Sequence, residues 1–257
     1  MKRRPERGRT AGTSPDEKPE KRTGTEQNPE NRSTAGERNL KVRIRQMLLQ
    51  ILYPEGAICL GCGKVSDGEC LCPACRQELE NGEMADSWNL RDLHGIPAWS
   101  IRPHRGLARK LVLRLKYGAE ARAAAELTGL LRQRPAVFPE FSRDTVVTWV
   151  PMPERRRRER CIDHGRMLAE GTARELGLPC RKLLLRKGNS RPQAGLNMKR
   201  RQRNLGKAYF PTERISFPVL LVDDVLTTGT TAQRCIEALR TAGAEEMTVL
   251  TMTWAAK

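Results

Sequence analysis

Hydrophobic residues are distributed unevenly along the chain and divide it into several parts. Residues 1–38 contain no Val, Ile, Leu, Phe, Trp, Tyr or Cys. They cannot bury enough apolar surface to offset the entropy of ordering, so we expect a disordered basic tail. Over residues 39–54 apolar side chains recur at helical spacing up to Pro54, which predicts a short amphipathic helix. Its basic face is either the solvated side of a docking helix, which we favour, or a surface that lies on an anionic membrane or a partner.

From residue 98 onward, short apolar runs alternate with stretches of helical period. The apolar runs predict strands at residues 98–102, 145–150, 182–186, 217–223 and 247–253. The helical periods predict helices at residues 107–118, 120–134, 164–176 and 230–241. Strands that alternate with helices favour a parallel sheet flanked by helices, because parallel neighbours need a crossover connection. We therefore expect an α/β domain over residues 88–257.

A Cys- and Gly-rich segment, residues 55–87, lies before this domain and shows neither helical nor strand period. It contains two CxxC pairs, Cys59 with Cys62 and Cys72 with Cys75. Two residues between thiolates let both reach one tetrahedral ion, and four thiolates without histidine are typical of a closed structural zinc site. Cys70 is an alternative ligand in place of Cys72, although only Cys72 has the CxxC spacing. Buried thiols or a redox pair are the other interpretations, and two pairs in a chain without an export signal favour zinc.

The charge of the chain indicates the class of its partners. The 257 residues carry a formal net charge of +17, of which residues 1–45 hold +6 and the remainder +11. The folded part is therefore basic itself, which favours nucleic acid, nucleotide phosphates or a membrane surface. No run approaches the ~18 apolar residues of a membrane span, and the first apolar run is too short and too late for a secretory signal. We expect a cytoplasmic protein.

The segment that indicates chemistry most clearly runs from Val219 to Thr231. An apolar strand leads into Asp223 and Asp224, and a Thr- and Gly-rich loop then precedes a helix. The carboxyl edge of a parallel sheet is where open α/β folds bind ligands, and a helix N-terminus offers unpaired N–H groups to a phosphate. Gly229 permits a close approach of the backbone. The two carboxylates suit sugar hydroxyls, or a metal held through water, so the pattern predicts a sugar-phosphate site.

This segment resembles the phosphoribosyl-pyrophosphate (PRPP) signature of type I phosphoribosyltransferases. The resemblance implies that Asp223 and Asp224 hold the ribose 2′- and 3′-hydroxyls and act in catalysis. It implies a PRPP-binding segment that continues through Val225, Leu226, Thr227, Thr228, Gly229, Thr230 and Thr231, with the 5-phosphate on the last five. Lys116 is our candidate for the diphosphate, which Mg²⁺ would accompany. A lysine that ends a helix is also an ordinary partner of the helix dipole.

A four-cysteine module before such a domain resembles the ComF family of bacterial competence proteins. Three further stretches agree with that family: Leu115–Tyr117, Val150–Pro153 and residues 193–210. One stretch departs from it. Where the family usually carries Arg-Gly-Phe-Asn-Gln, this chain has Arg160-Cys161-Ile162-Asp163-His164, and only the arginine is kept.

The resemblance implies a type I phosphoribosyltransferase-like parallel sheet with helices on its faces, preceded by the zinc module and the tail. It implies a PRPP-binding protein that transfers phosphoribose to a nitrogen acceptor and is linked to DNA uptake. The alternative is a non-catalytic module that binds PRPP or nucleic acid and docks DNA-uptake partners. Single-stranded DNA, a DNA-uptake helicase and peripheral contact with a membrane are further possible partners. His94, His104 and His164 are isolated in the sequence, and we assign them no catalytic role.

Overall fold

The computed structural model describes residues 58–66, 68–81, 88–118, 120–154, 156–157, 162–187 and 208–255. The predicted tail and amphipathic helix lie outside the described residues. Most of the stretch 193–210 that resembles the ComF family also lies outside them. None of the described helices has the length and apolar character needed to cross a lipid bilayer.

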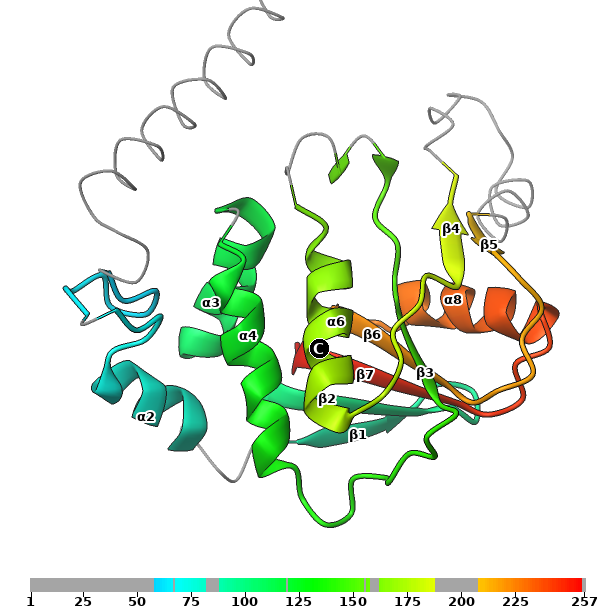
Figure 1. The fold of residues 1–257 in the computed structure, drawn as a ribbon, viewed down its shortest axis with the longest axis horizontal. Helices are drawn as coiled ribbons and strands as arrows, with labels where there is room; N and C mark the ends of the chain where they lie inside the picture. Colours follow the sequence, from blue (N-terminus) through cyan, green and yellow to red (C-terminus); the bar gives the residue numbers. More distant parts are fainter. Residues whose placement is uncertain are drawn as a thin grey trace, which may run out of the picture. The chain divides into compact units, whose positions relative to one another are not determined.

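A five-stranded sheet forms the centre of the described part, with strand order β1-β2-β7-β6-β3 (Figure 1). Its strands are β1 Asn89–Asp92, β2 Pro97–Pro103, β3 Val146–Trp149, β6 Val219–Leu226 and β7 Met247–Trp254. β1 pairs antiparallel with β2, and all the other neighbours pair in parallel. The inner strands β2, β6 and β7 are mostly buried along their length because both of their faces are covered. The predicted α/β fold with a parallel sheet and flanking helices is confirmed.

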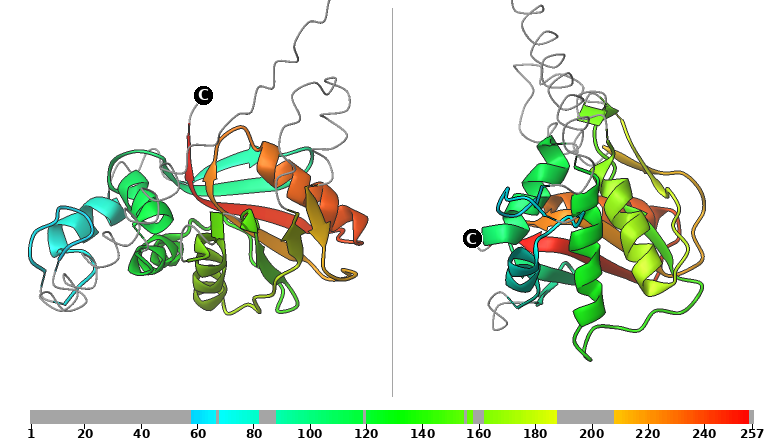
Figure 2. Two further views of the ribbon diagram at one scale, coloured as in Figure 1. Left: turned by 90° about the horizontal axis from the view of Figure 1, so that it is seen from above. Right: turned by 60° about the vertical axis from the view of Figure 1, so that its left-hand side comes forward.

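Helices cover both faces of this sheet (Figure 2). The helices α3 Gly106–Tyr117, α4 Arg122–Gly129 and α6 His164–Leu176 pack on one face, and α8 Thr230–Thr241 packs on the other. Strand β6 alternates accordingly: Leu220 and Val222 belong to the core under α3, α4 and α6, whereas Val219 and Leu221 belong to the core under α8. The alternation places Asp224 on the side of α3 and α6, and Asp223 on the side of α8.

A second, two-stranded sheet pairs β4 Leu184–Arg186 with β5 Tyr209–Pro211 in antiparallel fashion. Both strands contact α8. The strand predicted at residues 182–186 corresponds to β4, and β5 and β1 were not predicted. Both missed strands are short. They are strands because they pair with a neighbouring strand, and neither contains an apolar run long enough to be recognised in the sequence.

The cysteine segment contains a helix, α2 Pro73–Asn81, where the sequence shows no helical period. This helix was not predicted. Only Cys75 and Leu79 of the helix are buried, so its apolar stripe is too short to be recognised in the sequence. Pro73 is its first residue, where a missing N–H costs nothing. Cys59, Leu60, Leu71, Cys75 and Leu79 share one apolar core with α3.

Two predicted boundaries differ from the structure in ways that matter for the site. The helix expected over residues 120–134 ends at Gly129 and continues only as a 3₁₀ turn, Leu130–Gln133. The strand expected to end at Asp223 continues to Leu226, because the ladder with β7 extends to the pair Leu226–Trp254. The two aspartates therefore lie within β6 and share its rigidity.

Candidate functional site

The aspartates of β6 lie near its carboxyl end, beside β7 and just beyond the end of β3. Asp224 is buried, and two other elements reach its carboxylate. Lys116 Nζ, from the last turn of α3, lies 2.8 Å from Oδ1, and His164 Nε2, from the first residue of α6, lies 3.0 Å from Oδ2. The side chains of Asp224, Lys116 and His164 are 9%, 19% and 10% exposed, so solvent screens these contacts only weakly.

These contacts set the charge of Asp224. Burial alone would raise its pKa, but the hydrogen bond from His164 and the charge of Lys116 outweigh burial and hold the pKa below its ordinary value. Asp224 is therefore an ionised carboxylate with both oxygens occupied by side chains of the protein.

Asp223 has the opposite electrostatic character. Burial and the neighbouring charge of Asp224 raise the pKa of Asp223 to about 8, although the N–H of Asp224 donates to its Oδ1 at 2.9 Å. The pair thus consists of one ionised carboxylate and one carboxyl that keeps its proton near neutral pH. Such a pair can both accept and donate hydrogen bonds, which suits the hydroxyls of a sugar.

A tight turn, residues 227–229, connects β6 to α8. Gly229 has φ +77°, and an added Cβ would lie 2.7 Å from Leu93 Cδ2, so both the backbone conformation and the packing require glycine here. Thr228 Oγ1 lies 2.9 Å from Thr230 Oγ1 and 3.4 Å from Thr230 N. Thr227, Thr228 and Thr230 are exposed. The turn therefore presents hydroxyls beside the N-terminus of α8, an arrangement suited to an anion.

The structure thus brings together the predicted residues Lys116, Asp223 and Asp224 with the turn at residues 227–229. Their roles toward a ligand stay predictions. His164, to which the sequence analysis assigned no catalytic role, lies in direct contact with Asp224. Its position at the start of a helix that follows the predicted strand 145–150 was the available signal, because that connection belongs to the carboxyl edge of the sheet.

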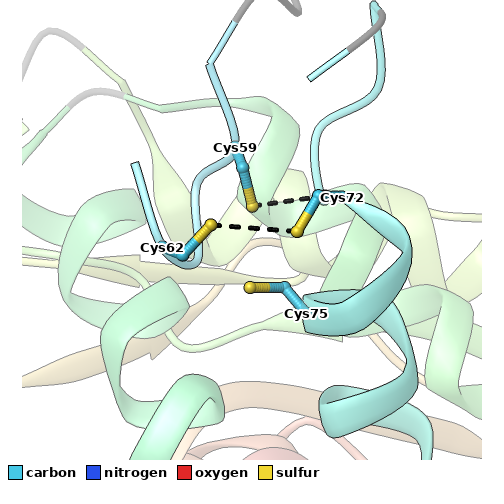
Figure 3. Close-up of side chains that lie close together, drawn as sticks. All are labelled: Cys59, Cys62, Cys72 and Cys75. Carbon is cyan, nitrogen blue, oxygen red and sulfur yellow. Dashed lines mark hydrogen bonds between the residues drawn. The ribbon is translucent and has the colours of Figure 1, made fainter. Parts of the chain in front are cut away.

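The cysteine cluster lies apart from these residues and contains Cys59, Cys62, Cys72 and Cys75, whose sulfurs all lie within 4.8 Å of one another. Figure 3 shows the four sulfurs facing a common centre. Cys62 Sγ and Cys72 Sγ are 3.8 Å apart, and a tetrahedral ion with ~2.3 Å bonds to sulfur would separate its ligands by about this distance. Cys70 is outside the cluster that the described residues form.

The environment of Cys59 favours a thiolate. Backbone N–H groups of Gly61 and Cys72 donate to Cys59 Sγ at 3.3 and 3.2 Å. Burial would raise the pKa of Cys59, but these backbone hydrogen bonds outweigh it and lower the pKa to about 6. Burial and the neighbouring thiols instead raise the pKa of Cys75 to about 12, so a metal would have to displace its proton. Four sulfur donors at tetrahedral spacing fit a thiolate-bound metal such as zinc.

Comparison with known proteins concerns the C-terminal part of the chain. Residues 161–254 match the family model described as "phosphoribosyl transferase domain". The search of curated proteins found no match. The matched residues include α6, β6, α8 and β7. The sheet with helices on both faces is phosphoribosyltransferase-like in its fold, and the four-cysteine cluster precedes it in the chain.

Three solved structures illustrate the similarity of this chain to known folds. The allosteric regulatory enzyme of purine biosynthesis is 24% identical (TM-score 0.39), over 55% of this chain and 30% of the other. The glutamine PRPP amidotransferase of B. subtilis is 22% identical (TM-score 0.38), with the same coverage. The orotate phosphoribosyltransferase of Mycobacterium tuberculosis H37Rv is 18% identical (TM-score 0.31), over 69% of this chain and 74% of the other. The match spans under a third of the first two enzymes.

Proposed function

We propose that this protein binds PRPP at the carboxyl edge of its central sheet and transfers the phosphoribosyl group to a nitrogen acceptor. The observation that carries the proposal is the order of groups along β6 and α8. Two adjacent carboxyl groups of unlike charge stand at the end of β6, and a threonine turn with a helix N-terminus follows directly. Asp223 and Asp224 would hold the ribose hydroxyls, and residues 227–231 would hold the 5-phosphate.

Lys116 would act on the diphosphate. In the structure its ammonium group is paired with Asp224. When PRPP binds, a ribose hydroxyl would donate to Asp224 and the diphosphate would pair with Lys116. These two contacts with the ligand would replace the internal ion pair. The exchange preserves the charge balance of the site, because each buried charge keeps a partner.

The transfer step breaks the bond between ribose C1 and the diphosphate oxygen and forms a bond from C1 to the acceptor nitrogen. The diphosphate leaves with the bonding electron pair, and the acceptor nitrogen loses its proton. Positive charge develops on the ribose in the transition state, and the ionised Asp224 would stabilise that charge. Mg²⁺, bound with the diphosphate, would supply further neutralisation of the leaving group.

For the cysteine cluster we propose structural zinc. All four ligands are thiolate donors, which leaves no open position for a substrate. Cys59 and Cys75 are buried and share a core with the apolar residues of α3. A metal at this position would stabilise the fold of residues 58–81 rather than take part in the transfer.

The direct test is to incubate the protein with PRPP, Mg²⁺ and a panel of nucleobases and amines, and to measure diphosphate release together with thermal shift. We expect stabilisation by PRPP that is lost in Asp223→Ala with Asp224→Ala. Asp144→Ala is a matched control, because Asp144 is an exposed aspartate that precedes β3 at the opposite edge of the sheet. Equal stabilisation of the double variant would contradict the proposed site. Stabilisation without diphosphate release would exclude the transfer for that panel.

A second candidate function is a non-catalytic module that binds nucleic acid. The segment of residues 97–118 carries six basic residues and no Asp or Glu. Arg109 and Lys110 are exposed on α3. This surface, with the resemblance to the ComF family, favours single-stranded DNA and a helicase of DNA uptake as the partners of that function. Binding through phosphates would weaken steeply as salt rises, and a flat salt response would remove this candidate.

A further inference from the structure

The hairpin β1–β2 contacts the turn that would hold the 5-phosphate. Arg91, from β1, donates from Nη1 to the carbonyl oxygen of Thr227 at 3.0 Å and from Nη2 to that of Ala255 at 3.5 Å. The first carbonyl belongs to the turn, and the second follows the end of β7. One guanidinium therefore connects the turn to the neighbouring strand end.

A second contact of the hairpin fixes the other end of the turn. Leu93 packs at the position where a Cβ of Gly229 would be, at 2.7 Å from Cδ2. The hairpin thus constrains the turn at Thr227 by hydrogen bonding and at Gly229 by close packing. Neither contact was predictable, because β1 itself was not recognised in the sequence.

The electrostatics of the turn make Arg91 more than a structural contact. The PRPP-binding segment, residues 225–231, contains no Lys or Arg. Among the described residues, no ion pair joins Arg91 to a carboxylate, and the groups to which it donates, on Thr227 and Ala255, are neutral carbonyls. The positive charge of Arg91 is therefore not neutralised by an acidic side chain of the described part, and it lies at the edge of a turn that is otherwise without cationic side chains.

The peptide geometry links this contact to phosphate binding. In a trans peptide the C=O of one residue and the N–H of the next point in opposite directions. Because Arg91 holds the Thr227 carbonyl toward itself, the N–H of Thr228 points to the other side of the turn. No backbone acceptor for that N–H is found among the described residues.

We propose that Arg91 is a positioning residue for the 5-phosphate: it holds the Thr227–Thr228 peptide with the N–H of Thr228 toward the phosphate, and it adds positive charge on the carbonyl side of that peptide. This inference rests on the proposed function, since it concerns the same site. The N–H of Thr228 would donate to the charged phosphate, and loss of its orientation should weaken binding by about ten-fold, which equals about 1.4 kcal/mol. The effect should appear for ligands with a phosphate and be absent for ribose without one.

The experiment measures dissociation constants of PRPP, ribose 5-phosphate and ribose by calorimetry on the full chain with its metal. We compare the wild type with Arg91→Ala, Arg91→Lys and Arg240→Ala. Arg240 is the matched control, because its Nη2 donates to a carbonyl of the same hairpin, that of His94, at 3.4 Å. We expect Arg91→Ala to weaken both phosphate ligands about ten-fold, Arg91→Lys to lie in between, and Arg240→Ala to bind as the wild type does.

The outcomes separate this inference from the function on which it rests. If the wild type binds neither phosphate ligand, the proposed function fails and the role of Arg91 fails with it. If the wild type binds both and Arg91→Ala binds them equally tightly, only the role of Arg91 is overturned. Equal weakening by Arg240→Ala would also overturn it, because general damage to the hairpin would then explain the loss. If Arg91→Ala does not fold, the test uses Arg91→Lys, which keeps the charge and most of the side chain. Binding of both phosphate ligands as tight as in the wild type would then overturn the role of Arg91.

Discussion

Replacement of Asp223 by Asn tests the electrostatics of the candidate site while keeping its shape. The side chain is partly buried, and its Oδ1 accepts the N–H of Asp224, a bond that the Oδ1 of Asn can also accept. The substitution therefore removes chiefly an ionisable group. Burial and the charge of Asp224 raise the pKa of that group to about 8.

The sign of the expected pH effect follows from proton binding. An aspartate of the unfolded chain loses its proton near its ordinary pKa of 3.8, whereas folded Asp223 keeps its proton up to about pH 8. Between these values the folded state binds more protons than the unfolded state, so the free energy of unfolding falls as pH rises. Because one pKa unit corresponds to about 1.4 kcal/mol, we expect the wild type to lose at least ~2 kcal/mol relative to Asp223→Asn between about pH 5 and pH 8.5.

Urea unfolding at a series of pH values, followed by tryptophan fluorescence, measures this difference. The titration of groups that do not interact with Asp223 cancels when the two free energies of unfolding are subtracted. Parallel pH profiles of the wild type and Asp223→Asn would refute the reasoning. Asp224→Asn is the control with the opposite sign: the pKa of Asp224 is lowered, so its charge stabilises the fold above about pH 4, and its loss should destabilise the protein there.

Two further predictions concern the cysteine cluster and the turn before α8. Purified Cys59→Ser with Cys72→Ser should contain no stoichiometric zinc by elemental analysis, whereas Cys70→Ser should retain it, and zinc retained in the double variant would contradict the assigned ligands. Gly229→Ala should lower the free energy of unfolding by about 1–3 kcal/mol, because alanine is strained at φ +77° and its Cβ would collide with Leu93. In the double variant Gly229→Ala with Leu93→Ala the collision is removed, but the backbone strain at residue 229 remains. If Gly229→Ala costs no stability in the Leu93→Ala background, the predicted strain is absent.

The elements with strong local signals were predicted closely. The helices α6 and α8 have the bounds expected from their patterns, His164–Leu176 and Thr230–Thr241. The ends of α6 carry local signals: Asp163 accepts the N–H of Arg166 at its start, and Gly177 ends it with φ +68°. Amphipathic period and caps are properties of neighbouring residues, so they can be recognised in the sequence.

Elements that depend on a neighbour were not predicted. Strand β1 has only four residues, two of them charged, and it exists through its pairing with β2. Strand β6 extends past its aspartates because β7 continues beside it. The helix α2 has only two buried residues, and its packing beside α3 is absent from the local pattern. In each case the stabilising contact comes from residues far away in the sequence.

For the candidate site, the sequence alone determined the types of chemical group and their order: two carboxyl groups, a threonine turn, a distant lysine and two CxxC pairs. Only the tertiary structure decided which of these groups meet. Lys116, His164 and Asp224 come from α3, α6 and β6 and converge because parallel strands bring their carboxyl ends to one edge. Burial raises the pKa of both aspartates, and the direct contacts from His164 and Lys116 lower it for Asp224 alone, so their charges differ although the residues are identical and adjacent. Charge in a buried site depends on desolvation and on the surrounding partners, and these are properties of the folded chain.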